Sequence, residues 1–128
     1  MLNIVVLDGI TYDVDVISID RTADMLDKYA NRTEDGELHR ELIGVYFNYQ
    51  LKFGPGVNID EYNRLWEKLT EAVAFHTVTV PYGNGSYTFV AYFASVKDQL
   101  MLKERQDNFF NNLSVNFIAR SPARRPGG

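Results

Sequence analysis

The feature that most constrains this chain is a strict alternation of residue types over residues 45–53. Apolar residues stand at every odd position, and Tyr46, Asn48, Gln50 and Lys52 stand between them. Successive side chains of a strand point to opposite faces of a sheet, so the pattern predicts one long strand with a buried face. Gly54-Pro55-Gly56 then ends the strand. The chain must therefore build a sheet that is covered on at least one side.

Other segments carry weaker strand patterns. The 8 Tyr and 8 Phe favour pleated, half-buried surfaces. Asp8-Gly9 lies between apolar runs and predicts a hairpin with a type I′ turn. The remaining strand predictions are residues 2–7, 10–19, 75–80, 87–96 and 113–119, with tight or polar turns at 81–85 and 104–108. Residues 96–103 either extend the preceding strand or start a new one.

One amphipathic helix is predicted over residues 58–73. Asn58 can cap it, and Glu61 three residues later resembles a capping box. The apolar residues recur at spacings of three and four, which is typical of a helix with one buried face. Trp66 lies in this stripe, so Trp66→Ala is expected to cost about 3–5 kcal/mol of stability.

The segment Arg21–Arg40 is rich in charge and has two interpretations at its start. Met25, Leu26 and Tyr29 form one stripe if residues 21–30 are helical, and the same residues also fit an extended segment. The polar run 31–36 ends in Asp-Gly, which predicts a loop. Its charge suggests that it projects into solvent or onto another subunit.

These patterns predict a mainly β protein with one α-helix (α+β), either an antiparallel β-sandwich or an open barrel flanked by the helix. With 128 residues the chain fits a single domain, expected over residues 1–120. Residues 121–128 contain two prolines and end in Pro-Gly-Gly, so we expect a flexible C-terminal tail.

The residue types needed for catalysis are sparse. The chain has no cysteine and two histidines, His39 and His76, neither in a metal-ligand spacing. The acidic pairs, such as Asp13 with Asp15, fit the wet face of a strand. The glycine-rich run 82–86 joins two strands and lacks the Gly-Lys-Ser/Thr ending of a phosphate loop. We therefore expect no catalytic residues, no metal site and no cofactor.

Charge and hydropathy limit the partners. The formal charge of −4 argues against a general nucleic-acid binder. No apolar stretch approaches the ~18 residues of a membrane span, and the first residues lack the basic start of a signal peptide. We expect a soluble protein that acts or is assembled inside a cell, with no membrane partner. The basic residues Arg120, Arg124 and Arg125 suit either a solvated tail or a short anchor for an acidic neighbour.

Three tyrosines are candidates for an interface on the protein surface. Tyr46, Tyr82 and Tyr92 lie in or beside predicted strands at positions away from the expected core face. Aromatic side chains on an exposed sheet mark interfaces, although a second buried face under the helix would also explain them. A small binding module, such as a carbohydrate-binding β-sandwich, is the alternative function, because tyrosines on a flat sheet can stack on sugars.

The stretch Asp35–Tyr49 resembles a segment of small tail-module proteins of Gram-positive siphophages and prophages. Those proteins carry a Gly-x-x-x-Arg-(Asp/Glu)-x-Ile-Gly-(Thr/Val)-Tyr-(Tyr/Phe)-Asn-Tyr run, which Gly36–Tyr49 follows closely. Further matches follow in order over nearly the whole chain. They are Tyr62–Leu69, His76–Val78, Pro81–Gly83, and Leu113–Ala119 with Pro122 and Arg124 close behind.

The resemblance implies a structural protein of the phage tail or baseplate, in the virion, assembled in the host cytoplasm. Proteins of that group form rings, usually sixfold, with a β-sandwich, one flanking helix and a long loop. It also implies other tail proteins as partners and DNA passage through the lumen without specific binding. The loop Arg21–Arg40 would be the arm that reaches a neighbour. Its expected interface residues are Arg21, Asp24, Lys28, Arg32, Glu34, Asp35, Glu37 and Arg40, together with the aromatics Tyr46, Tyr82 and Tyr92.

Overall fold

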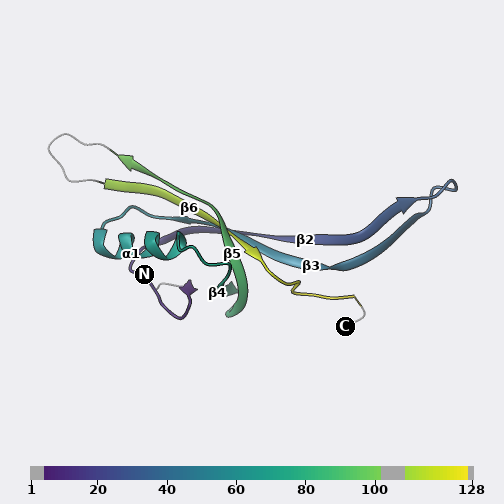
Figure 1. The fold of residues 1–128 in the computed structure, drawn as a ribbon, viewed down its shortest axis with the longest axis horizontal. Coiled ribbons are helices and arrows are strands. Elements are labelled where there is room, and N and C mark those ends of the chain that lie inside the picture. The colour runs from purple at the N-terminus through teal and green to yellow at the C-terminus, as the bar shows by residue number, and fades with distance from the viewer. Residues whose placement is uncertain (1–4, 102–108, 127–128) are drawn as a thin grey trace.

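Long antiparallel strands dominate the structure, a computed structural model that describes residues 5–101 and 109–126 (Figure 1). The mainly β class with a single α-helix is confirmed for this part of the chain. The predicted polar turn 104–108 lies outside the described residues. In chain order the elements are β1 Val6–Leu7, β2 Val16–Arg32, β3 Leu38–Phe53, α1 Ile59–Leu69, β4 His76–Tyr82, β5 Gly85–Met101 and β6 Phe109–Ala119.

The strands form one open sheet in the order β1-β4-β5-β6-β3-β2, and every neighbouring pair is antiparallel. The sheet does not close, because β1 and β2 stand at its two edges. Two hairpins extend beyond the body in opposite directions, β2–β3 on one side and β5–β6 on the other (Figure 1). The second extension was not expected from the sequence.

The alternation over residues 45–53 does produce a strand, and it lies at the centre of the core. Tyr49, Leu51 and Phe53 are buried, whereas Gln50 and Lys52 are exposed on the opposite face. Over residues 49–52, β3 pairs with β6 on one edge and with β2 on the other. The strand begins seven residues earlier than the alternation, at Leu38.

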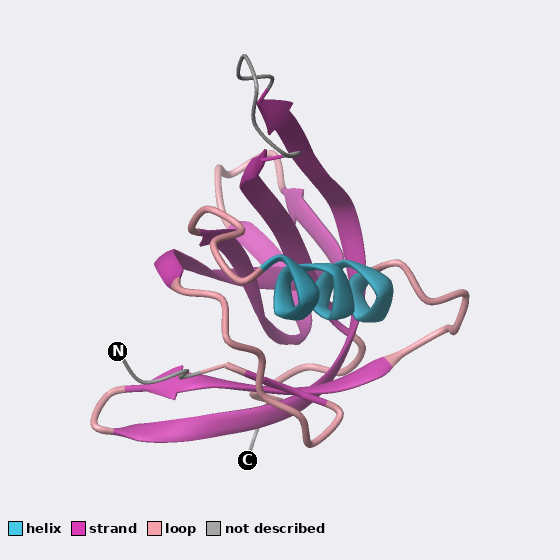
Figure 2. Cartoon of the chain, turned by 90° about the vertical axis from the view of Figure 1, so that its left-hand side faces the viewer, coloured by secondary structure: helices cyan, strands magenta, loops and turns pink. Residues whose placement is uncertain are grey.

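Helix α1 lies across one face of the sheet and buries Tyr62, Leu65 and Leu69 (Figure 2). Asn58 caps it as predicted, since its side chain accepts a hydrogen bond from the Glu61 amide. The predicted end at residue 73 is wrong. The Thr70 hydroxyl donates to the Trp66 carbonyl at 2.8 Å, and the chain leaves the helix there to reach β4.

The Asp8-Gly9 turn forms, but the predicted first hairpin is wrong beyond it. Both central residues have positive φ, 51° at Asp8 and 82° at Gly9, as a type I′ turn requires. Among the described residues, only Leu7 and Ile10 pair across the turn, and residues 2–4 of the predicted first strand lie outside the described part of the chain. Residues 11–15 are irregular, because β1 pairs with β4 and β2 pairs with β3 instead. Residues Tyr12 and Val14 still bury their side chains in the core.

The C-terminal segment 121–126 lies against the sheet, whereas the sequence predicted a free tail from residue 121. The Val45 amide donates to the Arg124 carbonyl at 2.9 Å, and the Ala123 amide donates to the Val45 carbonyl at 2.8 Å. The segment thus occupies the edge of β3 next to the part that β6 covers. Gly44 permits this, because a Cβ there would lie 2.6 Å from the Pro122 Cβ.

Leu65→Ala is expected to lower the free energy of unfolding by about 2–5 kcal/mol, since it empties a buried site between α1 and the sheet. Trp66 is only partly buried, so Trp66→Ala should cost less than Leu65→Ala. Urea unfolding measures both. Glu67→Ala, exposed on α1, is the control and should change stability by no more than about 0.5 kcal/mol. A larger loss at Trp66 than at Leu65 would contradict this placement.

Gly44→Ala is expected to destabilise the protein by about 1–3 kcal/mol, because the new methyl group overlaps Pro122 and the Arg124 carbonyl. It should also speed tryptic cleavage after Arg120 and Arg124. Gly54→Ala is the matched control, since its Cβ would meet Asp15 at an ordinary 3.5 Å. Equal cleavage rates in the two variants would show that Gly44 does not hold the tail.

Candidate functional site

The most distinctive surface is a two-stranded arm formed by the distal parts of β2 and β3 (Figure 1). We call residues 21–44 the arm. The expectation of a loop over Arg21–Arg40 is wrong, because cross-strand pairing continues from Arg21↔Tyr49 to Arg32↔Leu38. Only residues 33–37 form the connecting turn. The open choice for residues 21–30 is thereby settled as strand.

Apolar side chains are exposed on both strands of the arm. Met25 is 61% exposed and Tyr29 is 47% exposed. The spacing of these residues suggested a helical stripe, but irregularities in the ladder at Asp27 and Lys28 shift the alternation instead. The five large exposed apolar residues of the arm are Met25, Leu26, Tyr29, Leu38 and Ile43.

The expected interface charges all lie in this hairpin, and several pair within it. Arg40 Nε lies 2.5 Å from Asp27 Oδ1, and Lys28 Nζ lies 3.5 Å from Glu41 Oε2. Asp24 accepts a hydrogen bond of 2.7 Å from the side chain of Asn48. These cross-strand contacts stabilise the arm itself, so they leave fewer charges free for a partner.

The tip of the arm is an ordered turn with an acidic surface. The Asp35 carboxylate accepts hydrogen bonds from the Thr33 hydroxyl and from the Glu37 amide. These hydrogen bonds, led by the one from Thr33, hold the pKa of Asp35 below its ordinary value. Arg32 donates to the Gly36 carbonyl at 2.7 Å. The side chains of Glu34 and Glu37 make no hydrogen bond or ion pair with any other described residue.

The three expected interface aromatics do not lie together. Tyr46 and Tyr92 belong to the face of the sheet opposite α1, since they alternate with the core residues of β3 and β5. Tyr92 is 45% exposed. Tyr82 lies on the other face, stacked on Phe47 with ring centroids 6.2 Å apart. The carbohydrate-binding alternative, which used Tyr46 and Tyr92, stays a prediction.

A hollow of about 310 Å³ lies at the base of the arm, lined by Arg21, Thr22, Ala23, Phe47 and Tyr82. The Arg21 guanidinium lies over the Tyr82 ring, 5.6 Å from its centroid. Arg124 lies 5.7 Å from the Phe47 centroid, and its Nη2 is 3.5 Å from the Tyr82 hydroxyl. No local sequence pattern predicted this hollow, because its lining residues come from three distant segments.

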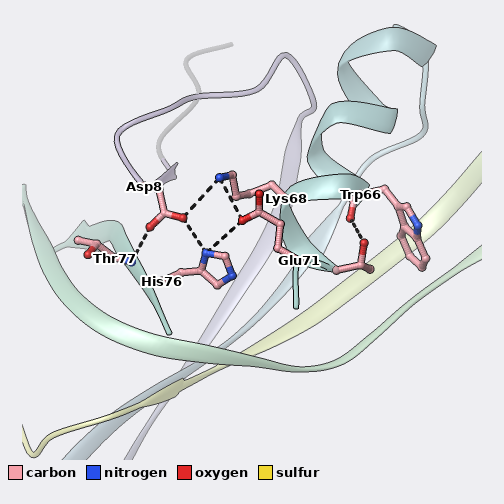
Figure 3. A network of polar contacts seen from close by, with 7 residues as sticks. Asp8, Trp66, Lys68, Glu71, His76 and Thr77 are labelled. Carbon is pink, nitrogen blue, oxygen red and sulfur yellow. Dashed lines mark hydrogen bonds and ion pairs between the residues drawn. The ribbon is translucent and has the colours of Figure 1, made fainter. Parts of the chain in front are cut away.

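A second cluster of polar groups surrounds His76 (Figure 3). Its Nδ1 lies 2.6 Å from Asp8 Oδ2, and its ring stacks on Phe93 with centroids 4.3 Å apart. Asp8 also accepts a hydrogen bond from the Thr77 amide at 2.8 Å. Residues Asp8 and His76 are far apart in sequence, so no local pattern predicted the pair. His39 is exposed on the arm, across from Asn31.

This cluster ties the N-terminal turn, the end of α1 and β4 together. Asp8, Glu71 and His76 place one ligand atom each within 4.8 Å of the others, as a metal site would. However, Lys68 Nζ lies 3.5 Å from Asp8 Oδ2 and 3.2 Å from Glu71 Oε1. The ammonium group thus already supplies the positive charge between the two carboxylates. The geometry favours a structural role for the cluster.

Comparisons with known proteins do not assign the chain to a family. Neither protein-family models nor curated protein sequences give a match. No helix in the described part of the chain has the length and apolar character needed to cross a membrane.

The environment of Asp8 leads us to expect that the protein loses stability in acid. Burial opposes its ionisation, but hydrogen bonds from His76 and Thr77, with the charges of His76 and Lys68, hold its pKa below the ordinary 3.8. A lowered pKa stabilises the fold above the ordinary value, and that contribution disappears as the pH falls through the folded-state pKa. We expect the melting temperature of the wild type to fall more steeply below about pH 4 than that of Asp8→Asn.

Melting curves recorded from neutral pH to about pH 2 compare the two proteins over the range in which carboxylates titrate. Asp20→Asn, exposed on β2, is the control and should follow the wild type. Parallel curves for Asp8→Asn and the wild type would exclude a stabilising Asp8 carboxylate.

Proposed function

We propose that this protein is a structural subunit that joins copies of itself through the β2–β3 arm, as a component of a phage or prophage tail or baseplate. The observation that carries the proposal is the arm, a two-stranded ribbon with exposed apolar side chains on both strands. The phage assignment is supported by the sequence resemblance alone. The arm supports the self-assembly.

A two-stranded ribbon is at best marginally stable in water when nothing covers it. Here β2 is an edge strand, and the other edge of the hairpin is covered by β6 at residues 49–52 of β3 and by the C-terminal segment at Val45, which leaves the part beyond Val45 uncovered among the described residues. Backbone groups along both edges of the arm are therefore open to pairing with another chain. Packing against a neighbouring subunit would bury Leu26 and Tyr29 and protect these edges.

The proposed assembly is a closed ring, with six subunits as the expected number. Identical subunits that contact through two different surfaces form a ring when the rotation between them closes. The net charge of −4 per chain would repel phosphate groups, so DNA would pass such a lumen without specific binding. Other tail proteins are the proposed partners above and below the ring, in the virion.

The double variant Leu26→Ser with Tyr29→Ser is expected to weaken self-association by at least about tenfold, since buried apolar anchors dominate most interfaces. The core should remain folded, because both side chains lie outside it. Light scattering over a concentration series measures the association, and electron microscopy shows whether rings form. Circular dichroism and melting curves check the fold.

Val57→Ser is the matched control, because Val57 is 86% exposed but lies away from the arm. It should assemble as the wild type does. A wild-type protein that stays monomeric at high concentration, and also fails to join purified tail proteins, would overturn the proposal.

A further inference from the structure

The hollow at the base of the arm is a positively charged, aromatic surface without an acidic partner. Arg21 and Arg124 both lie against its rings, and neither forms an ion pair within residues 5–101 and 109–126. Such a surface is suited to a carboxylate, because guanidinium groups bind carboxylates with paired hydrogen bonds.

The tip of the arm has the complementary charge. Residues 32–37 hold one arginine and three acids, Glu34, Asp35 and Glu37, so their net charge is 1 − 3 = −2. Asp35 is occupied by hydrogen bonds inside the turn. Glu34 and Glu37 are both exposed and carry the free carboxylates.

The tip cannot fill the hollow of its own chain. Pairing between β2 and β3 runs from Ala23, in the hollow, to Arg32, at the tip, with register shifts at Asp27 and Lys28. Nine residues of strand at about 3.3 Å each hold these two points about 30 Å apart. An acidic tip that enters this hollow must therefore come from a second copy.

We propose that the acidic tip of one arm, through Glu34 and Glu37, binds in the Arg21–Arg124 hollow at the base of the arm of a second copy. This contact rests on the proposed self-assembly and names the surface that receives the arm. The aromatic rings of Phe47 and Tyr82 hold both guanidinium groups in place and exclude some water from the contact. The bound carboxylates then compensate two charges that have no acidic partner within the described chain.

Charge reversal tests the contact. Arg21→Glu alone, or Glu34→Lys with Glu37→Lys, should each raise the concentration for half-assembly by about 100-fold or more, because like charges would face each other. The triple variant that combines all three changes should restore assembly. Equimolar mixing of the Arg21→Glu protein with the Glu34→Lys/Glu37→Lys protein should restore it as well. Light scattering measures every sample, with circular dichroism to verify folding.

Lys52→Glu is the matched control, an exposed charge reversal on the opposite face of the sheet, and it should assemble as the wild type does. Normal assembly of the reversed variants would overturn this contact and leave the proposed function intact. Loss without restoration in the triple variant and in the mixture would also overturn it. A wild type without any assembly would overturn both proposals.

Cross-linking gives an independent measurement, since the chain has no cysteine of its own. A Glu34→Cys protein and an Ala23→Cys protein are mixed and treated with a short bismaleimide linker. We expect a covalent dimer in the mixture well above the level in either protein alone. Val57→Cys replaces Ala23→Cys in the control mixture. Equal yields in the two mixtures would contradict the contact.

Discussion

Burial of one face of β3 is the constraint on which the rest of the structure depends. Tyr49, Leu51 and Phe53 pack into the core, and this fixes which way every other residue of the strand points. The same strand then continues outward as half of the arm. The packing of β3 in the core therefore determines which way the side chains of the arm, and of the hollow at its base, point.

The sequence predicted those elements whose signals are local and periodic. The long strand, the helix with its Asn58 cap, the Asp8-Gly9 turn and the last strand were found because each depends on residues close in sequence. The arm was misread as a loop for a physical reason. The two strands of the arm are largely exposed on both faces, so burial does not require apolar and polar residues to alternate strictly. In addition, a shift of the ladder near Asp27 interrupts the alternation that is present.

The surface sites could not be predicted from the sequence, for a different reason. Arg21, Tyr82 and Arg124 meet only because β2, the β4–β5 hairpin and the C-terminal segment converge beside β3. The His76 cluster likewise needs β1 to pair with β4, a connection across most of the chain. The eight charged residues expected at an interface lie in one hairpin, but their pairing within it depends on the register of the two strands.

The irregularity at Asp27 and Lys28 has a geometric consequence. A bulge increases the right-handed twist of the ribbon at that point, so the tip is rotated about the long axis of the arm relative to its base. In the proposed assembly, a subunit that holds the tip would consequently be turned relative to the subunit that provides it. If the proposed contact forms, the angle between neighbouring subunits is set by the backbone of the arm, so insertion or deletion of one residue there would change that angle while leaving the core untouched.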